Sequence, residues 1–120
     1  MLSIHVENIG DITIVECKGR IVRSEAAFKL REAVTSQRDA RIVVLDLSEV
    51  CAIEGGGLGM LWFLLQWAHK HDIGLKLFNL TNSVRDRLQR ANPMLQFDIT
   101  TLEEMMALKA LSDSRYTLAA

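Results

Sequence analysis

Hydrophobic residues alternate with polar ones at the start of the chain and again after a short turn. Residues 2–7 read Leu-Ser-Ile-His-Val-Glu, and residues 12–17 read Ile-Thr-Ile-Val-Glu-Cys. A period of two residues is typical of a strand with one buried face. The segment between them, Asn-Ile-Gly-Asp, favours a tight turn. The pattern therefore predicts an antiparallel hairpin whose second strand ends at Gly19.

The middle of the chain predicts helices that alternate with fully buried strands. Residues 41–47 and 73–78 are apolar on both faces, which is typical of central strands covered on two sides. Apolar residues at helical spacing predict helices over residues 24–37, 57–71 and 82–91. Ser24 and Asn82 are the expected N-caps of the first and third helices.

The C-terminal part predicts one more strand and one more helix. Residues 97–99 form a short strand, and Thr101 with Glu104 forms a capping box that opens a helix to about Leu111. Residues 112–120 are expected to be a flexible tail. The order β-β-α-β-α-β-α-β-α predicts a single α/β domain over residues 1–111, with about four helices and a mixed, mostly parallel sheet.

Composition narrows the class of protein. The 120 residues suit one domain, and a formal net charge of −1 gives no general attraction to nucleic acid or to an anionic membrane. The start of the chain has no signal-peptide pattern, and the most apolar run, residues 58–65, is too short to span a bilayer. We therefore expect a cytoplasmic protein without membrane insertion. Cys17 and Cys51 are far apart in sequence, and both are expected to be buried.

A glycine-rich segment separates the central strand from the next helix. Residues 54–59 read Glu-Gly-Gly-Gly-Leu-Gly. Such a segment permits close approach of another surface, and the helix N-terminus behind it is positive. It lacks the Gly-Lys-Ser/Thr ending and the GxGxxG pattern of nucleotide loops. We expect a turn shaped for a protein neighbour, with no catalytic group and no cofactor. No metal site is expected either, since His69 and His71 point to different sides of a helix.

The helix after the glycines is apolar on more than one side. On a helical wheel the core-facing stripe comprises Leu58, Leu61, Leu65 and Ala68, flanked by Trp62 and Leu64. Met60, Phe63 and Trp67 fall on the opposite side, where an amphipathic helix would be polar. Either another element of the domain covers this side, or a partner does, and the pattern leaves both alternatives open.

These segments resemble the family of sulfate-transporter and anti-sigma-factor-antagonist (STAS) domains. Residues 43–50 (VVLDLSEV) and 53–59 (IEGGGLG) are similar to the family's VLDLSxV and IDSSGLG patterns, and residues 75–80, 84–88 and Gly19 extend the likeness. The resemblance implies a regulatory module without enzymatic activity. In bacterial antagonists of this family a serine kinase that acts as anti-sigma factor phosphorylates a loop serine, and the phosphorylated form releases the kinase.

This chain departs from the family pattern at the regulated position. The family aspartate corresponds to Glu54, and the two hydroxyl positions correspond to Gly55 and Gly56, the latter at the serine position. No phosphorylation is therefore expected in the loop. A related branch, the STAS subunits of ABC-type lipid transport complexes, has Thr-Gly-Gly there, with the threonine at the position of Gly55.

The resemblance and the residues together predict a protein-binding module. The predicted partner is an anti-sigma factor, a serine kinase or a related regulator, and the chain could also form a homodimer. Two alternative functions are left open. The chain could be a cytosolic subunit of an ABC-type lipid transport complex, or a small-anion or nucleotide-binding domain. The predicted partner-binding residues are Glu54, Gly55, Gly56, Gly57, Gly59, Met60, Phe63 and Trp67.

Overall fold

The computed structural model describes residues 2–21, 25–53, 56–91 and 98–119. The strands are β1 (Leu2–Ile9), β2 (Ile12–Ile21), β3 (Ile42–Ile53), β4 (Gly74–Phe78) and β5 (Asp98–Thr100). The helices are α1 (Glu25–Thr35), α2 (Gly56–Lys70), α3 (Asn82–Ala91) and α4 (Leu102–Ala119). The predicted element order is confirmed within the described residues.

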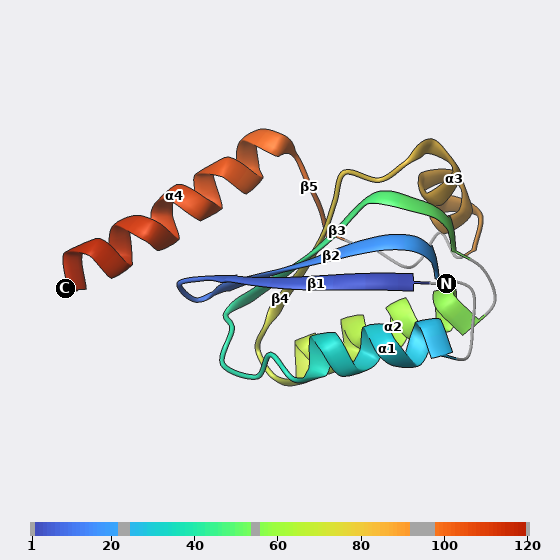
Figure 1. Cartoon of the computed structure of the whole chain (residues 1–120), viewed down its shortest axis with the longest axis horizontal. Helices are drawn as coiled ribbons and strands as arrows, with labels where there is room; N and C mark the ends of the chain where they lie inside the picture. The colour runs from blue at the N-terminus through green and yellow to red at the C-terminus, as the bar shows by residue number, and fades with distance from the viewer. Residues whose placement is uncertain (1, 22–24, 54–55, 92–97, 120) are drawn as a thin grey trace.

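The five strands form one sheet in the order β1-β2-β3-β4-β5. β1 is antiparallel to β2, as the hairpin pattern predicted, and the other neighbours are parallel. The sheet is therefore mixed and mostly parallel, so the predicted α/β fold class is confirmed. Figure 1 shows α1 and α2 on one side of the sheet, α4 on the other, and α3 at the end opposite the β1–β2 turn.

Alternation along the strands gives the sheet two unequal apolar faces. The larger core lies under α1 and α2 and contains Leu30, Val34, Leu45, Leu61 and Leu64, all fully buried. A smaller cluster under α4 contains Ile12, Ile14, Val44 and Met105. The larger core extends to the carboxyl ends of the parallel strands. There the start of α2 packs on the sheet.

Three predicted boundaries were wrong. β2 does not end at Gly19 but continues to Ile21, because the register with β3 shifts around Gly19, whose φ of 116° suits glycine in a bulge. β3 extends to Ile53, beyond the apolar run. α4 continues to Ala119 rather than ending near Leu111. The flexibility of residues 112–120 stays a prediction.

The helix caps were predicted in part. The backbone N–H of Glu104 donates to Thr101 Oγ1 at 3.1 Å, which confirms the cap of α4. Thr81, and not Asn82, caps α3, because the Val84 N–H donates to Thr81 Oγ1 at 3.4 Å. Ser24 lies outside the described residues. None of the described helices is both long enough and apolar enough to cross a membrane.

Candidate functional site

Four elements meet at the carboxyl ends of the parallel strands. Ile21 at the end of β2 pairs with Ile53 at the end of β3, and α2 begins three residues later. The hydroxyl of Thr81 donates to the carbonyl oxygen of Val50 at 3.0 Å, and that of Ser83 donates to the carbonyl oxygen of Cys51 at 3.2 Å. These bonds fix the start of α3 beside the end of β3. Residues 54 and 55 lie outside the described residues.

The described glycines of the segment occupy different environments. Gly57 is buried, and a Cβ added there would overlap the backbone carbonyl oxygen of Ile21. Gly57 therefore lets α2 pack directly on the end of β2. Gly59 is exposed, and a Cβ added there would meet nothing within 4 Å. Gly59 thus leaves the surface of the first turns of α2 open to a neighbouring molecule.

The core-facing side of α2 is rotated relative to the predicted stripe. Leu61, Leu64 and Ala68 are buried, whereas Leu58 and Leu65 are only half-buried. Trp62, which we expected to flank the core, is 45% exposed. The helix therefore uses Leu64 as a central core residue and carries Trp62 on the molecular surface.

The side of α2 with Met60, Phe63 and Trp67 lies next to α1. Met60 and Trp67 are half-buried and pack against the larger core, so at these two residues the structure favours cover by another element of the domain. Phe63 is 38% exposed, and the guanidinium carbon of Arg31 in α1 lies 4.7 Å from its ring centroid. Met60 and Trp67 are covered because α1 packs alongside α2. A helical wheel of α2 alone does not show this neighbour.

Two further features concern aromatic rings of the helical layer. Trp67 stacks on His71, with ring centroids 4.8 Å apart. Phe28 of α1 is 57% exposed and was missed as a surface candidate. Phe28 lies outside the stripe of Ala27, Leu30 and Val34, and that offset was the available signal. Phe28, Trp62 and Phe63 together give the helical layer an aromatic outer surface.

The two cysteines differ, contrary to the prediction that both are buried. Cys17 is buried, whereas Cys51 is exposed with its sulfur 3.4 Å from the carbonyl oxygen of Gly19. Burial, with a smaller contribution from the negative charge of Asp46, raises the pKa of the Cys17 thiol from 9.0 to about 12. Cys17 is therefore a neutral thiol at physiological pH. Among the described residues, no group of His, Cys, Asp and Glu is arranged to hold a metal ion.

Thiol labelling should distinguish the two cysteines. We expect Ellman's reagent at about pH 8 to modify Cys51 rapidly in the folded protein and Cys17 only after unfolding, because the reagent needs an accessible thiolate. Cys51→Ser should then leave no fast-reacting thiol. Rapid labelling of Cys17 in the folded Cys51→Ser variant would contradict the burial of that side chain.

The fold is shared with several proteins of known structure. An anti-sigma factor antagonist from Mycobacterium paratuberculosis superposes with a TM-score of 0.71 at 19% identity, covering 92% of this chain and 95% of that one. The Bacillus cell fate determinant SpoIIAA in its phosphorylated form gives a TM-score of 0.68 at 11% identity, covering 91% and 99%. The murine anion transporter Slc26a9 gives 0.69 at 14% identity, covering 88% of this chain but 18% of the transporter.

The amino-acid sequence itself identifies the family. The domain is an α/β fold of the kind found in anti-sigma factor antagonists. The STAS domain model matches residues 3–105, and the chain belongs to the STAS domain family. No curated protein sequence matches the chain. At identities of 11–19% the solved structures establish the fold alone.

Proposed function

We propose that the chain is a non-catalytic regulatory module that binds a protein partner through residues 54–59 and the exposed surface of α2. The observation that carries the proposal is the open surface at Gly59 beside exposed Trp62 and Phe63. Aromatic residues are enriched at interface cores, and a turn without side chains permits close approach of a partner backbone. The antagonists that share this fold support a partner of the anti-sigma factor or serine kinase type.

The start of α2 adds an electrostatic component. The first backbone N–H groups of a helix have no intrahelical acceptor, and the helix dipole makes this end positive. The first turn of α2 contains no acidic side chain that would neutralise it. An acidic group of a partner is therefore the complementary ligand, and the module is proposed to act in the cytoplasm.

The module is further proposed to bind its partner constitutively. The position of the family serine is Gly56, and Gly55 precedes it, so neither position has a hydroxyl group. A phosphate there would add about −1.5 to −2 charges at the positive helix end and repel an acidic partner. Incubation with the partner kinase and ATP should leave residues 48–59 unmodified, and a stoichiometric phosphate in this range would contradict constitutive binding.

Gly59→Glu should abolish most partner binding without unfolding the domain. The partner would be isolated with the tagged chain from the cells that produce it, purified, and titrated by calorimetry. We expect Kd to rise by about tenfold or more, which corresponds to about 1.4 kcal/mol, because the new side chain projects into open space at the proposed interface.

Ala110→Glu is the matched control for this charge. Ala110 is exposed on α4, on the opposite side of the sheet (Figure 1), and we expect its variant to bind like the wild type. Equal affinity of a folded Gly59→Glu variant and the wild type would exclude the start of α2 from the interface.

A further inference from the structure

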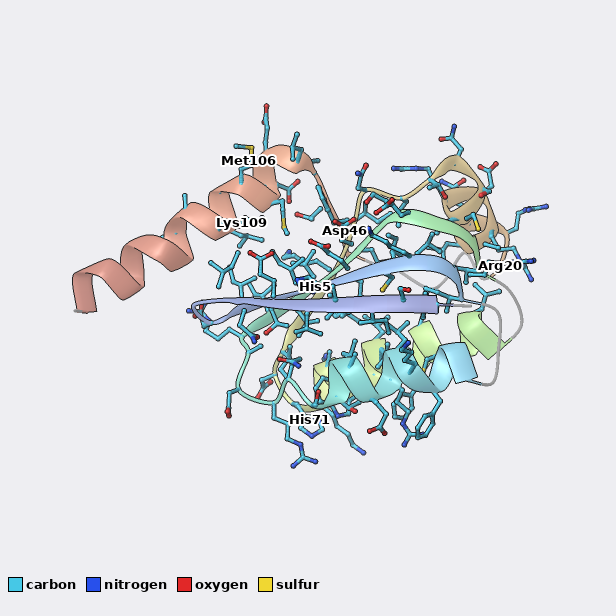
Figure 2. All side chains as sticks on the ribbon, in the orientation of Figure 1. His5, Arg20, Asp46, His71, Met106 and Lys109 are labelled. Atoms are coloured by element: carbon cyan, nitrogen blue, oxygen red, sulfur yellow. The ribbon has the colours of Figure 1, made fainter. Side chains whose placement is uncertain are left out.

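An excess of arginine surrounds the exposed end of β3. Arg20 of β2 is the register neighbour of Ala52 in β3. Figure 2 shows Arg20 at the same end of the molecule as α3. On α3, Ser83, Arg87 and Arg90 recur at helical spacing, i, i+4 and i+7, and so share one side of the helix.

The position of Ser83 orients this side of α3. Its hydroxyl donates to the carbonyl oxygen of Cys51, so the first turn on this side of α3 lies beside the end of β3. Arg87 and Arg90 follow on the same side of the helix, half-buried and exposed respectively. Arg20 lies in the strand next to β3, at the register position of Ala52, the residue after Cys51. We call Arg20, Arg87 and Arg90 the arginine surface.

The charges of the arginine surface are not neutralised by the described acidic residues around it. Glu49, on the same stretch of β3, is paired with Lys18 at 3.2 Å. Within the described part of the chain, the ion pairs of Lys18 and Arg41 include none of these three arginines. Arg90 donates from Nε to the backbone carbonyl oxygen of Asp86 at 3.4 Å, which is an uncharged acceptor. A protein with a formal net charge of −1 thus concentrates cations at one end.

We propose that the arginine surface binds an acidic segment of the partner protein. This inference rests on the proposed function, because the surface is continuous with the proposed interface: Arg20 precedes Ile21, whose carbonyl group touches the position of Gly57. Arginine is enriched at interfaces because its planar group pairs with carboxylates in a bidentate manner. Complementary charges at an interface chiefly accelerate association and select the partner.

The surface fits a protein better than a nucleic acid. Single-stranded nucleic acids bind where cationic side chains are interleaved with aromatic rings that stack on bases. β2 and α3, which carry the arginines, contain no aromatic residue, and neither does β3.

A titration with model ligands tests the proposal independently of partner identity. ¹⁵N-labelled protein would be titrated with a dodecaglutamate peptide, and separately with dodecalysine and with dodecathymidylate, at about 50 and about 300 mM NaCl. We expect dodecaglutamate at low salt to shift the amide resonances of residues 18–20, 51–53 and 82–91. Dodecalysine should shift none of them.

Charge reversal supplies the matched variants. Arg87→Glu/Arg90→Glu should raise the Kd for dodecaglutamate about tenfold. Arg38→Glu/Lys70→Glu makes the same change in net charge at exposed positions outside the arginine surface and should change Kd less than about twofold. Arg87→Gln/Arg90→Gln only neutralises the charges and should raise this Kd by an intermediate factor. It can be used in place of the charge-reversal variant if that variant does not fold. Equal losses in both reversals, or shifts confined to other elements, would overturn the proposal.

The same variants separate this proposal from the proposed function. With the purified partner, Arg87→Glu/Arg90→Glu should slow association and reduce its salt dependence, whereas Gly59→Glu should reduce affinity at every salt concentration. Unchanged partner kinetics in the reversal variant, with Gly59→Glu still impaired, would overturn the arginine surface alone. Absence of any partner would contradict the proposed function, while the peptide titration would still decide the arginine surface. Tighter binding of dodecathymidylate than of dodecaglutamate at that surface would replace the protein segment by a nucleic acid.

Discussion

Gly57→Ala should destabilise the domain, whereas the same replacement at Gly59 should stabilise it slightly. The added methyl group at residue 57 overlaps the carbonyl oxygen of Ile21. This oxygen belongs to the backbone of β2, which is paired with Ile53 of β3 at that residue, so it has little freedom to move. α2 must then shift away from the sheet, and such overpacking costs about 1–3 kcal/mol.

Gly59→Ala is the matched control in the same helix. Its methyl group meets nothing within 4 Å, and alanine is favoured over glycine in a helix by about 0.5–1 kcal/mol. In urea denaturation, the free energy of unfolding of Gly57→Ala should therefore be about 2–3 kcal/mol lower than that of Gly59→Ala. Equal stabilities would mean that α2 does not start against β2.

The sequence predicted the fold correctly where a pattern reflects the burial of a single strand or helix. The period-two alternation of residues 2–7 and the apolar run of residues 41–47 located β1 and β3, because strand burial leaves a local signature. The bulge at Gly19 was missed because it depends on the register with β3. The exposure of Cys51 was missed for the same kind of reason, since it lies beyond the apolar run, in the part of β3 that the pattern did not predict.

The candidate site was predicted with the same limits. Gly57 and Gly59 are indistinguishable in the sequence, and only the contact with Ile21 separates the buried glycine from the open one. Leu61 and Ala68 were placed correctly in the core because they face the sheet. Whether Met60 and Trp67 are covered within the domain could not be decided from the sequence, because their cover depends on α1, which lies along that flank of α2. A helical wheel shows how side chains are distributed around one helix axis. It does not show which other elements pack against that helix.

Replacement of Trp67 and of Phe63 by alanine should therefore have opposite consequences. Trp67 is half-buried, packs against the larger core and stacks on His71. Truncation of a fully buried tryptophan costs about 3–5 kcal/mol, so we expect Trp67→Ala to lower the free energy of unfolding by about 2–3 kcal/mol. Phe63 is 38% exposed, and its contact with the Arg31 guanidinium is of a kind that contributes about 0.5–1 kcal/mol at exposed sites. Its replacement should cost no more than about 1 kcal/mol.

Partner binding should rank the two variants the other way. Phe63 lies on the surface of α2 beside the proposed interface, and truncation of an aromatic anchor costs about 2 kcal/mol or more of binding free energy. The folded fraction of Trp67→Ala should retain most of its affinity, because the lost ring packs mainly inside the domain. Thermal unfolding of dilute monomer, with sedimentation to confirm its state, would be measured beside calorimetric titration of the partner. A large loss of stability in Phe63→Ala with unchanged affinity would assign this ring to the core and remove it from the interface.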